Sequence, residues 1–334
     1  MDMDLPTDLD KRGAQLRLDG EAIDLATAGD HFSLAAALAQ GANPRHLKSK
    51  ALWAAAAGGH TGCVKLLILC SNPMDDDSSA LKAAAENGHV ECLRLLIPVS
   101  DARADESQAL LLAAENGHAE CVKLLIPLSD PKTRTSKALG VAAYSGHLQC
   151  VKLLIPVSNP KDGDSHALQM AAMQGHAECV KLLIPLSDPK ADHSSSLTYA
   201  AHEGHLECVR LLIPCSTATA NRSLALRCAV GQGRHECARL LIPCSDLLND
   251  PCPFHEAIAE GSAKGAALML GHEPRLFELL DAASAIRQAN TDGFHELAAL
   301  LLSIAESRQL SELIEVENYE TAPSATLPQR AFRI

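Results

Sequence analysis

One phrase dominates the chain: Gly-His-x-Glu-Cys-Val-Lys-Leu-Leu-Ile-Pro, with small variations, recurs at a nearly constant interval. Its glycines are 29 residues apart and lie at Gly59, Gly88, Gly117, Gly146, Gly175, Gly204 and Gly233. A fixed period of this length is typical of a solenoid, in which one small unit is copied and buries its apolar face only against the neighbouring copies. The period therefore predicts a one-dimensional array of similar units.

The copy at residues 194–214 indicates how each unit is built. Leu197, Ala200 and Ala201 have the i, i+3, i+4 spacing of one apolar helix face, which predicts a short helix over residues 197–203. Gly204 is expected to end this helix in the left-handed conformation, and a second helix follows from His205 until Pro214 stops it. Asp-Pro and Asn-Pro pairs open several connectors and predict turns. The fold expected is all-α: a solenoid of stacked helix-turn-helix repeats with short connectors.

Composition and charge narrow the class of partner. Aromatic residues make up only 3% of the chain, which suits thin helices packed closely together. The formal net charge of -12 argues against nucleic acid and against an anionic membrane surface, because both attract clustered Lys and Arg. The acidic first ten residues lack the apolar core of a signal peptide, and no apolar run is long enough to predict a transmembrane helix.

The cysteines follow the repeat. Seven of the twelve occupy one position of successive copies: Cys63, Cys92, Cys121, Cys150, Cys179, Cys208 and Cys237. Packed helices lie about 8–10 Å apart, whereas a disulfide needs Cα atoms within about 7 Å. We therefore expect reduced, buried cysteines and a reducing compartment, the cytoplasm of the producing cell or of a host cell.

Helix, Gly-His, helix and loop together resemble the ankyrin repeat. Residues 110–125 read L-L-L-A-A-E-N-G-H-A-E-C-V-K-L-L, close to the helical core of that family, and the segments 253–261 and 41–44 match its outer repeats. The resemblance implies about nine repeats in residues 22–271. They would be preceded by a leader or cap at 1–21 and followed by a helical cap at 272–314 and a disordered tail at 315–334.

The inner copies are shorter than the family's usual unit of about 33 residues. The missing residues all fall in the connector, since the helical part keeps its full length. We therefore expect tight loops without the projecting β-hairpins of the family, and a binding surface that shifts toward the helices.

Two columns just before the repeated glycine vary freely between copies, while the core columns barely change. In ankyrin-like proteins these positions lie on the concave face and contact partners. The resemblance therefore implies a partner-binding ladder of Glu86, Asn87, Glu115, Asn116, Tyr144, Ser145, Met173, Gln174, His202 and Glu203. Tyr144 and Met173 at adjacent rungs are typical of an interface hot spot; the alternative is that they only cover neighbouring loops.

Two residue patterns resemble chemical sites, but neither predicts one. His and Cys recur at i, i+3, as in His118 and Cys121, but zinc needs four convergent ligands and each copy offers two, so no metal is predicted. We expect these histidines to hydrogen-bond backbone at the helix start. Cys252 and His255 could be taken as a nucleophile pair, yet the match of 253–255 to a repeat start explains them, so no catalytic residue and no cofactor are predicted.

The function predicted is that of a non-catalytic scaffold, a monomer that binds another protein. The resemblance also implies a host-interaction role of the effector type as one biological setting. Two alternatives stay open: the array is the targeting or regulatory arm of an enzyme whose activity lies in the C-terminal segment, or it is a structural spacer.

Overall fold

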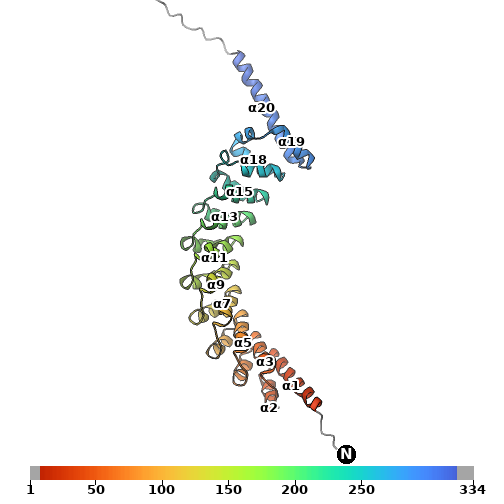
Figure 1. Ribbon diagram of the computed structural model, residues 1–334, viewed down its shortest axis with the longest axis vertical. Helices are drawn as coiled ribbons and strands as arrows, with labels where there is room; N and C mark the ends of the chain where they lie inside the picture. The colour runs from red at the N-terminus through yellow and green to blue at the C-terminus, as the bar shows by residue number, and fades with distance from the viewer. Residues whose placement is uncertain (1–7, 322–334) are drawn as a thin grey trace, which may run out of the picture. The chain divides into compact units, whose positions relative to one another are not determined.

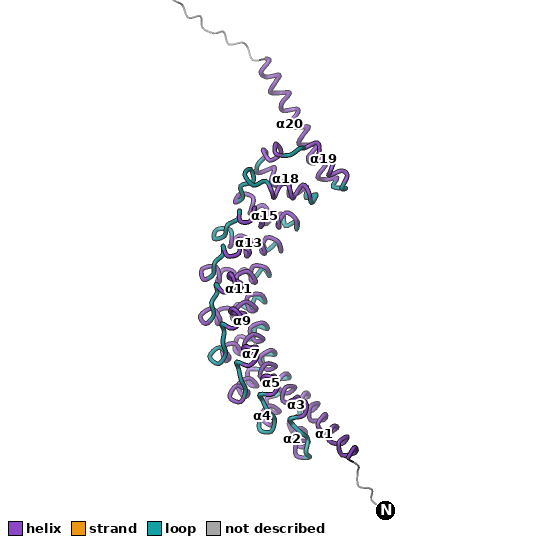
Figure 2. Tube along the Cα trace, viewed as in Figure 1, coloured by secondary structure: helices purple, strands orange, loops and turns teal. Residues whose placement is uncertain are grey.

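A computed structural model describes residues 8–321, and within that range it contains helices, turns and bends but no strand (Figures 1 and 2). The all-α prediction is confirmed, and so is the expectation that the inner connectors form no β-hairpins. The chain divides into two compact units, residues 1–217 and 218–334. Each unit is described by itself.

Seven helix pairs make up the described part of the first unit. They are α1 (Asp8–Ala28) with α2 (His31–Ala39), α3 (His46–Ala57) with α4 (Thr61–Ile68), α5 (Asp75–Glu86) with α6 (Val90–Leu96), α7 (Ala104–Glu115) with α8 (Ala119–Leu125), α9 (Thr133–Tyr144) with α10 (Leu148–Leu154), α11 (Asp162–Met173) with α12 (Ala177–Leu183), and α13 (Ala191–Glu203) with α14 (Leu206–Leu212). Short 3-10 turns follow three of the second helices: η1 (Ile97–Val99), η2 (Ile155–Val157) and η3 (Ile184–Leu186).

Three pairs make up the described part of the second unit: α15 (Ala220–Gly231) with α16 (His235–Leu241), α17 (Cys252–Ala259) with α18 (Ala263–His272), and α19 (Ala282–Thr291) with α20 (His295–Thr321). The 3-10 segments η4 (Ile242–Cys244) and η5 (Pro274–Leu279) follow α16 and α18. Residues 8–21 of the expected leader are helical within α1, and residues 315–321 of the expected tail lie in α20. Residues 1–7 and 322–334 are outside the described range.

In the first unit the helices form two layers. Each first helix contacts the next first helix, from α3 through α5, α7, α9 and α11 to α13, and the second helices from α4 to α14 contact one another in the same order. The core between the layers repeats with the sequence: Leu81, Ala84, Ala85 and Cys92 are buried, as are their equivalents in the other copies. Burying one such leucine contributes about 1.5–3 kcal/mol, and the alanines let the layers approach closely.

The connectors contain a feature that the sequence did not predict. The first helices α3, α5, α7, α11, α13 and α15 begin with a left-handed turn, as at Asp76, Asp77 and Ser78, whose φ angles are 53°, 53° and 59°. L-residues pass through this conformation at a cost of about 1–2 kcal/mol each. The turn places the Ser78 hydroxyl where it accepts a hydrogen bond from the backbone N–H of Asp101, at 3.0 Å, in the following connector. Equivalent bonds join Ser49 to Asn72, Ser107 to Asp130, Ser136 to Asn159, Ser165 to Asp188 and Ser194 to Thr217.

Candidate functional site

The repeated histidines join neighbouring copies. Nε2 of His118 lies 2.9 Å from the carbonyl oxygen of Glu86 in the preceding copy, and because a carbonyl can only accept, Nε2 must donate. The same bond, also at 2.9 Å, runs from His60 to Thr27, His89 to Ala57, His176 to Tyr144 and His205 to Met173. The expected backbone hydrogen bond is therefore present, but its acceptor lies at the end of the previous copy's first helix and not at the start of the histidine's own helix.

The repeated glycine makes room for this ring. At Gly88 the backbone φ is +72°, and an added Cβ would lie 2.4 Å from Nδ1 of His118. Glycine is thus required for two reasons, the left-handed backbone and the close approach of the ring. We call the pair of ring-on-glycine packing and Nε2–carbonyl bond the histidine clamp.

The histidine clamp holds the backbone of the predicted binding column. Its acceptor carbonyls include those of Glu86, Tyr144 and Met173, three of the residues predicted to contact a partner. Each of these residues sits at the C-terminal end of a first helix, where backbone carbonyls otherwise lack a helical partner. The clamp therefore satisfies a helix end and fixes the position of the side chain beside it.

The predicted ladder lies at the surface of the first-helix layer. Tyr144 is 46% exposed. Glu86, Asn87, Glu115, Asn116, Gln174 and Glu203 are exposed, and Ser145, Met173 and His202 are half-buried. These residues lie at the ends of α5, α7, α9, α11 and α13, which pack in that order. The structure therefore brings together as one surface the residues that the repeat comparison selected.

Sequence reasoning missed a second column on the same surface. Three residues before the ladder lie Leu112, Val141, Met170 and Tyr199, and residues three apart share a helix face. Leu112, Val141 and Met170 are half-buried, and Tyr199 is 36% exposed. This column also varies between copies, so the same comparison could have found it. We define the apolar strip as Leu112, Val141, Tyr144, Met170, Met173 and Tyr199.

Polar contacts at the ladder are mostly local. The side-chain amides of Asn87 and Asn116 donate to Ala83 and Leu112 of their own helices, at 2.9 Å in both cases, and His202 Nδ1 lies 2.9 Å from Glu203 Oε1. The carboxylates of Glu86 and Glu115 make no ion pair or side-chain hydrogen bond with the side chains that the structure describes, those of residues 11–133 and 136–309. They are free to meet charge from a partner.

The cysteine column is inert. All twelve cysteines are free thiols, and the seven at the repeat position are buried. Burial raises the pKa of the Cys121 and Cys150 thiols to about 11, so these side chains stay protonated near neutral pH. Where side chains are described, at residues 11–133 and 136–309, no three His, Cys, Asp or Glu side chains gather in a way that could hold a metal ion.

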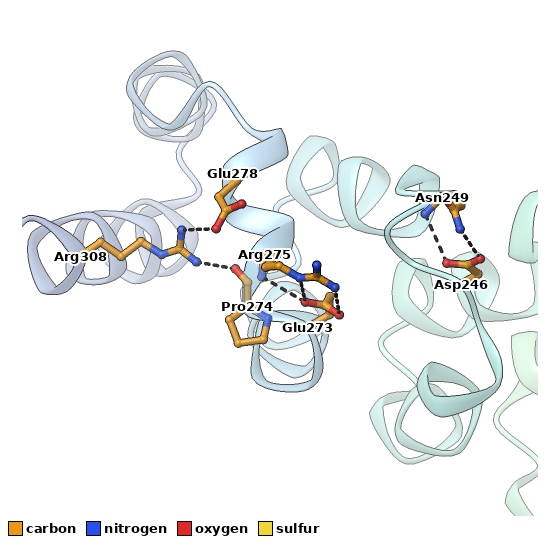
Figure 3. Close-up of polar contacts among 7 residues, drawn as sticks. All are labelled: Asp246, Asn249, Glu273, Pro274, Arg275, Glu278 and Arg308. Carbon is orange, nitrogen blue, oxygen red and sulfur yellow. Dashed lines mark hydrogen bonds and ion pairs between the residues drawn. The ribbon is translucent and has the colours of Figure 1, made fainter. Parts of the chain in front are cut away.

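The C-terminal pair is held by structural contacts. Arg308 of α20 donates to the carbonyl oxygen of Pro274 at 2.6 Å and pairs with Glu278 at 3.5 Å, which ties α20 to η5 (Figure 3). A groove of about 370 Å³ lies between α17 and α19, lined by His255, Ser284, Gln288 and Phe294 among others. Cys252 does not line this groove, so Cys252 and His255 do not share a cavity there.

No helix in residues 8–321 has the length and apolar character needed to cross a membrane. Comparison with curated protein sequences gives no match. Among solved structures, the ankyrin repeat domain of human ASB11 is similar at 22% identity and a TM-score of 0.45, over 52% of this chain and 95% of that one. The family model for ankyrin repeats (3 copies) matches residues 23–105, 98–164, 139–223 and 197–278, which together span most of the sequence. The chain belongs to the ankyrin-repeat family.

Proposed function

We propose that this protein is a non-catalytic scaffold that binds another protein through the first-helix face of residues 1–217. Ankyrin repeats are protein–protein interaction modules, and the proposal assigns that role to a particular surface. Its main support is the apolar strip, in which Tyr144 and Tyr199 are exposed beside half-buried Met170 and Met173.

General properties of protein surfaces favour contact between this strip and a partner protein over a role in covering neighbouring loops. Contiguous exposed apolar surface is uncommon on monomers and marks interaction sites. Tyr and Met are enriched at interfaces, where a few such anchors supply most of the binding free energy. The histidine clamps beneath them restrict backbone motion, and a surface fixed before binding loses less entropy when a partner docks.

The setting we propose is a reducing compartment, the cytoplasm of the producing cell or of a host cell, in which the protein acts as a monomer. The free state of all twelve cysteines supports the reducing compartment. Two alternatives from the sequence make different demands on the structure. A structural spacer does not require an exposed apolar strip. The targeting arm of an enzyme requires a reaction centre in the C-terminal segment.

The double variant Tyr144→Ala, Met173→Ala tests the proposal. The full chain and the variant are compared as baits in affinity capture with mass spectrometry, followed by affinity measurement with the captured protein. We expect the melting temperature to stay nearly constant, because both side chains are accessible to solvent. Affinity should fall by about 30-fold or more, as hot-spot residues cost about 2 kcal/mol or more when truncated.

The matched control is Leu128→Ala, Leu186→Ala, which removes two exposed leucines that follow the second helices. This control should keep both stability and binding. A melting temperature lowered by many degrees in the Tyr144, Met173 variant would mean that those side chains belong to the core. Unchanged capture by that variant would place the binding site elsewhere.

A further inference from the structure

We propose that the partner presents an amphipathic α-helix that is positively charged at one end, lies across α5 to α13, and places its apolar residues on the apolar strip. This inference rests on the proposed function and adds the chemistry of the ligand.

Charge is uneven along the ladder. The first ladder position holds Glu86 on α5 and Glu115 on α7, which form its acidic half, and Tyr144 on α9 and Met173 on α11. On α13 this position holds His202, and the acidic residue that follows it, Glu203, has its Oε1 2.9 Å from Nδ1 of His202. The apolar strip begins at Leu112 and runs on to Tyr199 of α13. A complementary ligand therefore carries positive charge over α5 and α7 and apolar side chains over α9, α11 and α13.

The acidic half is not neutralised from within. The nearest candidate on the same helix is Lys82, one turn before Glu86, but its Nζ pairs with Asp105 at 3.6 Å. Neither Glu86 nor Glu115 has an ion-pair partner among the described side chains of residues 11–133 and 136–309. With a net charge of -12 on the chain, these two carboxylates favour a basic segment and disfavour an acidic one.

The spacing of the rungs suits a helix. Packed helices lie about 8–10 Å apart, and seven residues of an α-helix rise about 10.5 Å. A ligand helix that lies across the array therefore places one apolar side chain, every two turns, against each first helix of the array. Its residues at i+3 or i+4 can contact the column of Leu112, Val141, Met170 and Tyr199. Helices that bind grooves use this i, i+3, i+4, i+7 pattern of anchors.

A displayed library of random peptides of about 30 residues, long enough as a helix (about 1.5 Å per residue) to cross five helices, provides the test. It is selected on the full-length protein and counter-selected on Tyr144→Ala, Met173→Ala. We expect the enriched peptides to hold Lys or Arg at one end and apolar residues at helical spacing in the rest. Synthetic copies should gain helical circular dichroism on binding. Their affinity should fall by about tenfold or more between 50 and 500 mM NaCl, since salt screens exposed charge pairs.

Glu86→Gln, Glu115→Gln should weaken these peptides by about tenfold and flatten their salt dependence. The matched control, Glu120→Gln, Glu178→Gln, removes the same charge from exposed second-helix positions and should leave affinity unchanged. Peptides that need Tyr144 and Met173 but lack basic residues, or whose apolar residues alternate, would overturn this inference and leave the proposed function standing. If no enriched peptide depends on Tyr144 and Met173, the strip binds no linear helix and the inference also fails. The proposed function itself fails only if the captured protein also ignores the double variant.

Discussion

The two units of the chain join their repeats differently. In residues 1–217 a histidine ring packs on the preceding copy's glycine at the junctions from His60 to His205. In His60, His89, His118, His176 and His205, Nε2 also donates to a backbone carbonyl of that copy. In residues 218–334 the histidine position holds Arg234 and Ser262, and no atom lies within 4 Å of a Cβ built on Gly233. At the last junction Phe294 takes the place of the ring and comes within 2.4 Å of a Cβ on Gly261.

Side-chain contacts between neighbouring copies occur in both units. In the second unit, Arg227 of α15 forms an ion pair with Glu256 of α17, which raises the pKa of the Arg227 guanidinium, and Ser223 donates to Asp250 at 3.4 Å. In the first unit, Lys48 pairs with Asp76, and the equivalent serines Ser49 and Ser136 donate to Asp75 and Asp162. Side-chain ion pairs near the surface contribute less than about 1 kcal/mol. The histidine clamp is therefore the junction that distinguishes the uniform repeats of residues 1–217 from the repeats after residue 217.

Glycine substitution gives the largest expected difference between the units. Gly88→Ala brings Cβ to 2.4 Å from Nδ1 of His118 and forces a left-handed alanine at φ +72°. The ring can move away only by giving up its bond to the Glu86 carbonyl. Left-handed strain of about 1–2 kcal/mol and overpacking of about 1–3 kcal/mol together predict a loss of about 2–5 kcal/mol in urea unfolding.

Gly233→Ala is the matched control. Its φ is +66°, similar to that of Gly88, but the added Cβ meets nothing within 4 Å. Only the conformational term remains, about 1–2 kcal/mol. Equal losses in the two variants would contradict the claim that the ring on glycine distinguishes the units.

Introducing the missing ring should have a smaller, opposite effect. Ser262→His places an imidazole at the clamp position of the α17–α18 repeat, facing the open space beside Gly233. If Nε2 reaches the carbonyl at the end of α15, the new hydrogen bond should add about 0.5–1.5 kcal/mol of stability. Thermal unfolding of the full chain measures the gain, and Ser262→Asn serves as the control because its side chain is too short to reach. A destabilised Ser262→His variant would mean that the α15–α17 junction has a different geometry.

Much of the fold could be predicted from the repeat alone. The period fixed the helix pairs, the glycine fixed the left-handed helix end at Gly204, whose φ is 88°, and the alignment of copies identified the buried Cys column. These features depend on residues close in sequence or on identical positions in neighbouring copies. A single sequence is sufficient to predict features of this kind, because the periodicity and the local residue preferences can be read from it directly.

The features that were missed depend on relations between copies. The left-handed turn at 76–78 is stabilised by a hydrogen bond between Ser78 and Asp101, which lies 23 residues further along the chain. Asp tolerates the left-handed conformation, but an Asp in the sequence does not predict it. The histidine acceptor is likewise 32 residues away. At the candidate surface, comparison of copies selected Tyr144 but passed over Tyr199, because the resemblance directed attention to the two columns beside the glycine.

The accessibility of buried thiols should reveal small differences in local stability between the two units. Cys121 of the first unit and Cys237 of the second are both buried, while Cys244 is exposed. Cys244 should react with a thiol reagent within the dead time at pH 8. Pulsed labelling across a urea series, read by mass spectrometry, should modify Cys237 at lower urea than Cys121, because labelling of a buried thiol requires local opening.

The buried thiols should also make the free energy of unfolding depend on pH. The folded pKa of Cys121 and Cys150 is about 11, above the value of 9.0 for a free thiol. The folded state therefore holds more protons than the unfolded state between these values, and linkage requires the free energy of unfolding to fall as pH rises from about 9 to 11. Cys121→Ala, Cys150→Ala should flatten this decline in urea unfolding at pH 8 to 10.5. A decline that is as steep in this variant as in the unchanged chain would contradict the assignment to these thiols.

Simultaneous labelling of Cys121 and Cys237 at every urea concentration would show that the clamped and unclamped repeats unfold as one unit. The difference between the two kinds of repeat would then be one of structure and not of local stability.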